Sequence, residues 1–90
     1  IPLYWGLYLN NLEPGNYQLL ISDFKVYKGR VTIEVIDERL HQIKKKDFST
    51  TTGNATVPFQ IRSDQKQIEI RIMATKDSQF SVPTYFVITS

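Results

Sequence analysis

The sequence predicts an all-β protein folded as a two-sheet antiparallel β-sandwich with about seven or eight strands. Apolar and polar residues alternate with a period of two through several short runs, which is the pattern of half-buried strands. Turn-forming residues separate these runs at regular intervals, as they do in sandwiches.

The first predicted strand covers residues 3–9, where the alternation has no break. Trp5 and the leucines share one face, which we assign to the core. Tyr4 and Tyr8 share the other face with Gly6 between them, and this face is less polar than a solvated one. The strand ends at the two asparagines that follow it.

A tight turn at Pro14-Gly15 leads into the second predicted strand, residues 17–24. Pro14 sets φ at the first corner and Gly15 supplies a positive φ at the next position. Both faces of this strand carry apolar residues, so we expect it to be central or to have its second face covered. We interpret residues 25–29 as a connection in which Gly29 marks the chain reversal.

Residues 30–37 form the plainest strand, with its valines and Ile33 facing inward. A charged turn at 37–39 returns into a further strand at 40–44. The charged stretch 34–46 also has a helical alternative, because its apolar positions fit a helix tolerably; these are Val35, Ile36, Leu40 and Ile43. The β-branched residues that open this stretch and the lack of a capping residue favour a hairpin instead.

The second half of the chain continues the same pattern. Residues 48–54 read as a polar loop, and 55–61 as a strand in which Pro58 removes one backbone donor. Pro58 therefore predicts an edge strand or a bulge. The remaining predicted segments are a turn at 63–66, a strand at 68–73, a loop at 75–81 and a closing strand at 85–89.

Composition restricts the function. The 90 residues suffice for a single domain over 1–90, and the start at Ile1 without Met suggests a piece of a larger protein. The net charge is only +2 and the one cationic run is Lys44–Lys46, so we expect no nucleic-acid partner. The absence of cysteine excludes disulfides, thiolate nucleophiles and zinc ribbons. No apolar run is long enough to span a bilayer, so we expect no membrane insertion.

The turn and core residues together resemble the galactose-binding-like jelly-roll sandwich found in many carbohydrate-binding modules. The resemblance implies a jelly-roll-like fold and an accessory role on cell-surface proteins. It carries over no specific binding residue, and fibronectin type III and collagen-adhesin B-type sandwiches use similar Pro-Gly-x-Tyr segments. The residues that carry it are Leu12, Pro14, Gly15, Tyr17 and Leu19, then Gly29, Val31, Ile33, Val35 and Asp37, then Phe59, Ile61, Ile68, Ile70 and Ile72.

Aromatic side chains are the main candidates for binding a ligand. Tyr4 and Tyr8 flank Gly6, where a flat ligand has room to approach. A sugar ring would stack on such aromatic faces while nearby polar groups hold its hydroxyls. The same tyrosines would also serve to cover the flank of the sandwich or to contact a neighbouring domain, and this alternative stays open. The predicted ligand-binding residues are Tyr4, Tyr8, Asn10, Asn11, Tyr27 and Arg30.

Catalytic groups do not converge in the sequence. His41 is the only histidine and the carboxylates are scattered over turns, so we expect no enzyme, no catalytic residues and no metal site built on histidine or cysteine. The resemblance leaves a structural calcium ion open, although no EF-hand spacing is present. The sequon Asn54-Ala55-Thr56 falls at a loop-to-strand junction.

The sequence therefore predicts a non-catalytic accessory module of an extracellular or cell-envelope protein. Its expected partner is a carbohydrate, bound through an aromatic face or rim, or a neighbouring domain of the same protein. The alternative is a structural or protein-interaction β-sandwich domain with no small-molecule ligand.

Overall fold

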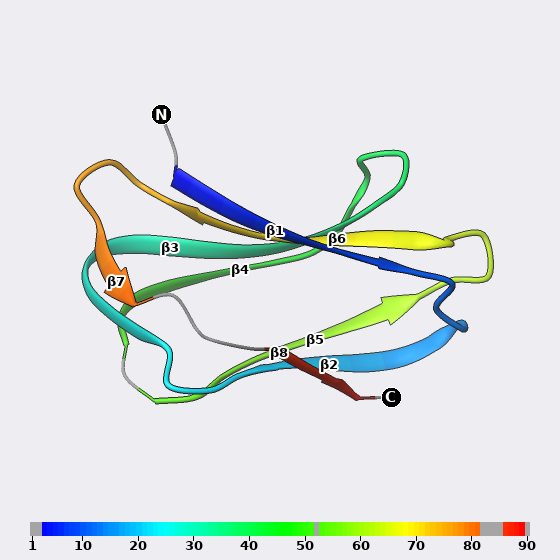
Figure 1. Cartoon of the computed structure of the whole chain (residues 1–90), viewed down its shortest axis with the longest axis horizontal. Coiled ribbons are helices and arrows are strands. Elements are labelled where there is room, and N and C mark those ends of the chain that lie inside the picture. Colours follow the sequence, from blue (N-terminus) through cyan, green and yellow to red (C-terminus); the bar gives the residue numbers. More distant parts are fainter. Residues whose placement is uncertain (1–2, 52, 82–85, 90) are drawn as a thin grey trace.

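The computed structural model describes residues 3–51, 53–81 and 86–89, and it describes side chains over 6–50 and 53–81. This part of the chain contains eight strands and no helix (Figure 1). Among the described residues, therefore, no helix is long and apolar enough to cross a membrane. The strands are β1 (Leu3–Asn10), β2 (Gly15–Ile21), β3 (Lys25–Asp37), β4 (Gln42–Thr51), β5 (Ala55–Ile61), β6 (Gln67–Ala74), β7 (Gln79–Ser81) and β8 (Phe86–Thr89).

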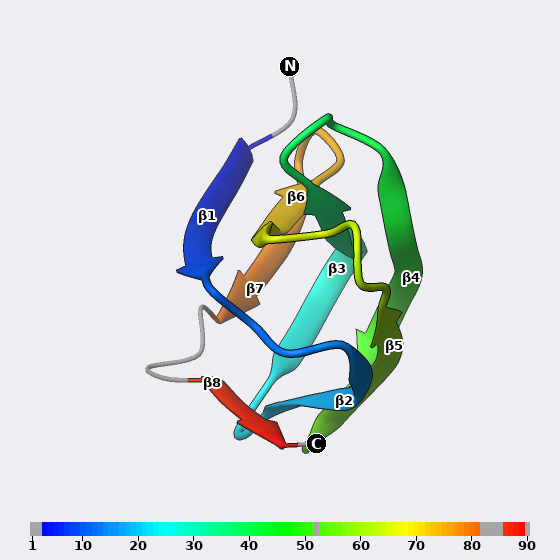
Figure 2. The same ribbon diagram turned by 90° about the vertical axis from the view of Figure 1, so that its right-hand side faces the viewer.

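The strands form two antiparallel sheets. The large sheet has the order β1-β6-β3-β4, with β7 added beside β3, and the small sheet has the order β5-β2-β8. Figure 2 shows the two layers, with β4 and β5 together on one flank. The predicted two-sheet antiparallel sandwich is confirmed.

The order of pairing along the chain is that of a rolled hairpin. The neighbours β3 and β4 pair with each other, β2 pairs with β5, and β1 pairs with β6. Each pair encloses the previous one in sequence, and successive pairs alternate between the large and the small sheet. This nested winding across two sheets gives the sandwich its jelly-roll-like character.

The core lies between the sheets and is built from alternate residues of each strand. Val31, Ile33 and Val35 of β3 are fully buried, as their period-two spacing predicts. Because residues 34–37 continue β3 and 42–46 belong to β4, the helical alternative for 34–46 is excluded. The remaining buried apolar residues of the core cluster are Leu19, Ile21, Phe24, Val26, Ala55, Val57, Phe59, Ile61, Ile68, Ile70, Ile72 and Ala74.

The turn before β2 is held by a tyrosine. The Tyr17 hydroxyl donates a hydrogen bond of 2.6 Å to the backbone carbonyl of Glu13, and its ring stacks on Phe59 at 5.8 Å between centroids. Gly15 has φ 153°, positive as predicted. β2 occupies the centre of the small sheet, as expected, and it buries Leu19 and Ile21 on one face while Leu20 on the other face is half-buried.

Gly29 does not reverse the chain, and the prediction of a connection at 25–29 is wrong. β3 runs without interruption from Lys25 to Asp37. Gly29 has φ 79° and a Cβ there would collide with Ser78, while the pairing of β3 with both β4 and β7 shifts register around this position. The glycine therefore forms a β-bulge, which requires the same positive φ as a turn.

Two further segments predicted as loops contain strands. β4 continues to Thr51 because Phe48 packs edge-on against Phe24, with ring centroids 5.1 Å apart. Within the segment 75–81, the last three residues form β7. Pro58 lies in β5 at the edge of the small sheet, as expected. The predicted core position of Trp5 lies outside the described side chains, and Tyr85 lies outside the described residues.

Candidate functional site

The structure separates the predicted ligand-binding residues into two groups. Tyr8 in β1 lies opposite Glu69 in β6, which lies opposite Ile36 near the end of β3. Tyr27 comes nine residues before Ile36 on the same strand, so it lies about 30 Å away along the sheet. Tyr8 therefore shares one end of the large sheet with the two asparagines that follow β1, and Tyr27 lies at the other end.

The group at the far end consists of Tyr27 and Arg30. Tyr27 is 58% exposed. The backbone N–H of Arg30 donates to the hydroxyls of Thr75 and Ser78, at 3.2 Å each. These contacts hold the β6–β7 loop beside the bulge, so the Arg30 backbone has a structural role. Neither residue comes near Tyr8.

At the near end, Asn10 closes β1 opposite Gln67 of β6. Asn11 follows in the left-handed region, with φ 60°, and its backbone N–H donates to the carbonyl of Lys66 at 2.9 Å. Tyr4 lies at the other end of β1, opposite Met73, and its side chain lies outside those described. The near group is thus Tyr8 and the two asparagines.

The space beside Gly6 is already occupied. A Cβ on Gly6 would lie 2.8 Å from Oε2 of Glu69, so the missing side chain makes room for the carboxylate. Glu69 is only 8% exposed although it sits on the outward face of the large sheet. The space beside Gly6 that was predicted for a flat ligand is therefore occupied by the Glu69 carboxylate.

Glu69 pairs with Arg71 on the same strand. Nη2 of Arg71 lies 3.0 Å from Oε1 of Glu69, whereas the buried Nε of Arg71 has no hydrogen-bond partner. A buried donor without a partner costs about 1–3 kcal/mol, and a buried ion pair is itself costly to desolvate. Stability alone gives no reason for this arrangement on an outer face.

A shallow hollow of about 110 Å³ opens over this pair. Two apolar side chains stand exposed at its rim, Tyr8 at 61% and Leu40 at 71%. Leu40 has φ 63°, a conformation that residues other than glycine adopt rarely. The polar residues around the hollow are Asp37, Glu38, Gln67, Glu69 and Arg71.

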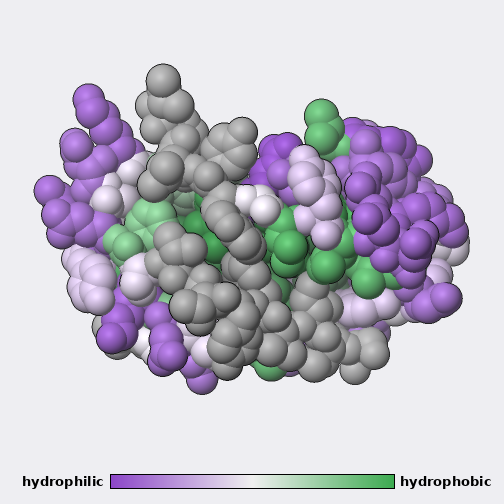
Figure 3. Space-filling model, viewed as in Figure 1, coloured by the Kyte–Doolittle hydropathy of each residue, from purple (hydrophilic) through white to green (hydrophobic). Residues whose placement is uncertain are grey.

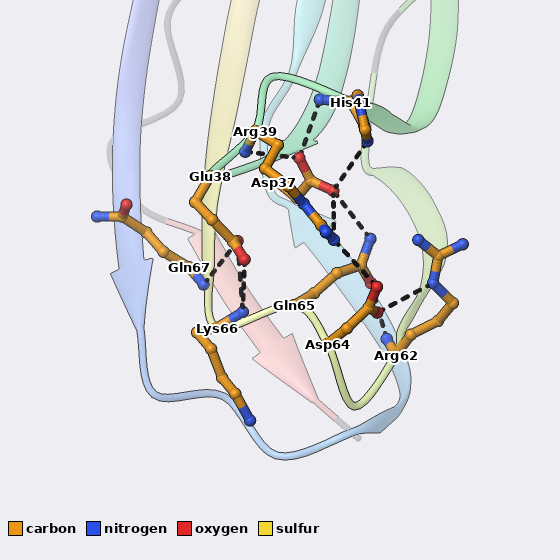
Figure 4. A network of polar contacts seen from close by, with 9 residues as sticks. All are labelled: Asp37, Glu38, Arg39, His41, Arg62, Asp64, Gln65, Lys66 and Gln67. Carbon is orange, nitrogen blue, oxygen red and sulfur yellow. Dashed lines mark hydrogen bonds and ion pairs between the residues drawn. The ribbon is translucent and has the colours of Figure 1, made fainter.

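Hydrophilic residues gather around this end of the molecule, where the β3–β4 and β5–β6 turns lie (Figure 3). Asp37 is buried between the two turns and joins them (Figure 4). Its Oδ1 accepts hydrogen bonds from the backbone N–H groups of Arg39 and His41, both 2.9 Å, and its Oδ2 accepts one from the Gln65 amide at 3.3 Å. Burial raises the pKa of Asp37, but these hydrogen bonds outweigh it and hold the pKa below its usual value.

The other carboxylates of the two turns are also engaged. Glu38 accepts hydrogen bonds from its own backbone N–H and from those of Gln67 and Lys66, which lower its pKa. Arg39 donates to Asp64 at 3.0 Å and lowers the pKa of that carboxyl. Carboxylates with lowered pKa are ionised at neutral pH and are poor proton donors. They build a rigid, charged support for the hollow.

A second hollow of about 340 Å³ lies on the opposite side of the same two turns, lined by His41, Gln42, Ile43, Gln60, Arg62 and Gln65. It is polar and has no phenolic or indole ring at its rim. Among the described residues there is no group of three or more histidine, cysteine or carboxylate side chains that could hold a metal ion.

Sequence reasoning missed Glu69, Arg71, Gln67, Glu38 and Leu40 as members of this surface. Glu69 and Arg71 alternate with buried isoleucines in β6 and therefore look like ordinary solvent-facing residues. The one available signal was Gly6, because a glycine within a strand often marks the close approach of another group. The strand register was needed to show which group approaches.

The chain matches no known protein-family model, and no curated protein is significantly similar to it in sequence.

Proposed function

We propose that the protein is a non-catalytic accessory module that binds carbohydrate through the hollow beside Tyr8, as part of an extracellular or cell-envelope protein. The observation that carries the proposal is the exposed Tyr8 ring next to the buried Glu69 carboxylate and its partly exposed partner Arg71. An aromatic platform and fixed donors and acceptors are the two elements that a sugar ring requires.

The size of the hollow fits binding across a surface. At about 110 Å³ it is smaller than the ~300–1,000 Å³ of enclosed ligand pockets, so a sugar would lie over it on the Tyr8 ring. The partly exposed guanidinium of Arg71 would donate to a sugar oxygen, and the Glu69 carboxylate would accept from a hydroxyl. Both side chains project from the middle of the large sheet, so little ordering entropy is lost on binding.

The second candidate is a structural or protein-interaction domain without a small-molecule ligand. Leu40 favours it, since an exposed leucine beside an exposed tyrosine suits contact with a neighbouring protein surface. A sugar uses the tyrosine and the charged pair, whereas a protein partner would also cover Leu40. The two candidates therefore differ in whether Leu40 matters.

A nuclear magnetic resonance titration of the isotope-labelled chain with a panel of mono- and oligosaccharides tests the proposal. We expect the amide signals of Tyr8, Gln67 and Glu69 to shift, and Tyr8→Ala to weaken binding about tenfold through the loss of ~1.4 kcal/mol of ring contact. Arg71→Lys keeps the positive charge but removes the planar guanidinium with its fixed donors, so it should weaken binding as well.

Tyr27→Ala is the matched control, because Tyr27 is equally exposed on the same sheet but lies at its other end. It should bind sugars as the wild type does. The absence of any chemical-shift change with every sugar of the panel, or shifts centred on Tyr27, would contradict the proposal. A protein that binds no sugar, and whose binding to a protein partner depends on Leu40, would support the second candidate.

A further inference from the structure

The edges of the two sheets differ in how they are protected against pairing with another strand. An exposed edge offers a row of backbone donors and acceptors, and proteins commonly block such rows with lysine, proline, short strands or a covering element. β4 carries Lys44–Lys46, β5 contains Pro58, and β8 has only four residues. Three described edges therefore carry a recognisable block.

β1 carries none of these blocks. It is eight residues long, contains no charged residue and no proline, and in the described part of the chain it pairs with β6 alone. The charged residues of β6 that lie opposite β1 on the outer face of the sheet, Glu69 and Arg71, neutralise each other at 3.0 Å. A second strand would therefore meet no charge on β1.

The residue order of β1 is close to symmetric about Gly6. Two copies can pair these strands antiparallel with Gly6 opposite Gly6. Leu3 of one copy then lies opposite Leu9 of the other, and Tyr4 lies opposite Tyr8. Trp5 lies opposite Leu7. Cross-strand aromatic and aliphatic pairs of this kind stabilise antiparallel sheets. A two-fold axis requires such self-complementarity, since the same patch serves both copies.

We propose that the free edge of β1 is a homodimer interface, in which two copies pair their β1 strands antiparallel about Gly6. The two large sheets then form one continuous sheet. Because the two-fold axis stands perpendicular to that sheet, both outer faces point to the same side, and so do the two hollows beside Tyr8. The proposal does not depend on what those hollows bind.

Sedimentation of the 90-residue chain from micromolar to millimolar concentration tests the interface. We expect a concentration-dependent dimer, together with slower hydrogen exchange at those amides of residues 6–9 that point away from β6. The double variant Tyr4→Lys/Tyr8→Lys places like charges opposite each other twice and should be monomeric. Mixing it with Tyr4→Glu/Tyr8→Glu should restore a heterodimer.

The charge-matched control is Gln18→Lys/Gln60→Lys, which adds the same charge to exposed positions of the small sheet and should stay dimeric. A wild-type chain that is monomeric up to millimolar concentration overturns the proposal. So does a dimer that survives both the lysine and the glutamate variants, or one that forms without protection of residues 6–9. If the variants do not fold, the concentration dependence of exchange in the wild type decides alone.

Discussion

The two edge strands of the large sheet, β1 and β4, differ in how they are protected against pairing with a strand from another molecule. β4 presents three consecutive lysines, and Nζ of Lys46 reaches across to the backbone carbonyl of Thr56 in β5 at 3.0 Å. That contact ties the edge of the large sheet to the edge of the small one. β1 is uncharged and has no such tie among the described residues.

The difference puts both proposed recognition surfaces on one side of the molecule. A strand edge that is charged and tied to the other sheet resists pairing, whereas an uncharged edge invites it. β1 also contributes Tyr8, so the candidate sugar surface and the candidate interface share one strand. The β4 side carries the polar tie between the two sheets, from Lys46 to Thr56.

The largest expected effect comes from Asp37, which secures the turn leading into β4. Asp37→Ala removes the acceptor for two backbone N–H groups and for Gln65, so the free energy of unfolding should fall by about 2–4 kcal/mol. Chemical denaturation measures it. Asp47→Ala is the control, since that exposed carboxylate accepts the Thr32 hydroxyl at 2.6 Å and no backbone N–H among the described residues, so its loss should cost under ~1 kcal/mol. An Asp37 variant within ~0.5 kcal/mol of wild type would contradict this role.

The same carboxylate gives the stability a pH dependence. The pKa of Asp37 in the folded chain lies below the ordinary value of 3.8, so the unfolded chain takes up its proton first as the pH falls. The stabilisation is complete above pH 3.8 and is lost as the pH drops through the lower, folded value. Asp37→Asn should flatten this part of the acid unfolding curve. An unchanged curve would contradict the assignment.

A smaller effect is expected from Lys46, the tie between β4 and β5. Lys46→Met keeps the aliphatic stem but removes the hydrogen bond to Thr56 and the ammonium 5.5 Å from the Phe48 ring centre, so it should cost about 1 kcal/mol. Hydrogen exchange should quicken in β4 and β5 and stay unchanged in β1. Lys45→Met, on the other face of the same strand, is the control. Equal effects of the two variants would mean that the tie contributes nothing.

The smallest effect on stability is expected from removing charge from β4. This change also tests directly whether the lysines prevent edge-to-edge pairing. Lys44→Thr/Lys45→Thr replaces two exposed lysines, so the free energy of unfolding should change by less than ~0.5 kcal/mol. Self-association should nevertheless increase, because the second edge of the large sheet loses its block. Sedimentation measures it, and Lys66→Thr/Lys76→Thr, in exposed turns, controls for net charge. No gain in association would mean that the lysines do not protect the edge.

Several parts of the fold follow from local sequence. The alternation of Val31, Ile33 and Val35 is sufficient to place a strand and its buried face, because side-chain direction reverses at every residue. The Pro14-Gly15 pair likewise marks the turn before β2, and Pro58 marks an edge. Each of these features depends on residues within a few positions of one another.

Other parts depend on neighbours distant in the chain. Gly29 has the same backbone requirement in a bulge as in a turn, and only the pairing of β3 with β4 and β7 distinguishes the two. The polar residues 49–51 lie in a strand because the preceding Phe48 meets Phe24 and β3 offers its hydrogen bonds. Local propensity is weak in such cases, and pairing decides.

The sequence by itself determined that this protein is an all-β sandwich, because alternation and turn chemistry are local properties of the chain. Only the tertiary structure decided which residues form a surface together. Strand pairing brought Glu69 beneath Gly6 and next to Tyr8, and the length of β3 carried Tyr27 about 30 Å away from them. Register between strands is fixed by the packing of the whole core, and no short stretch of sequence contains it.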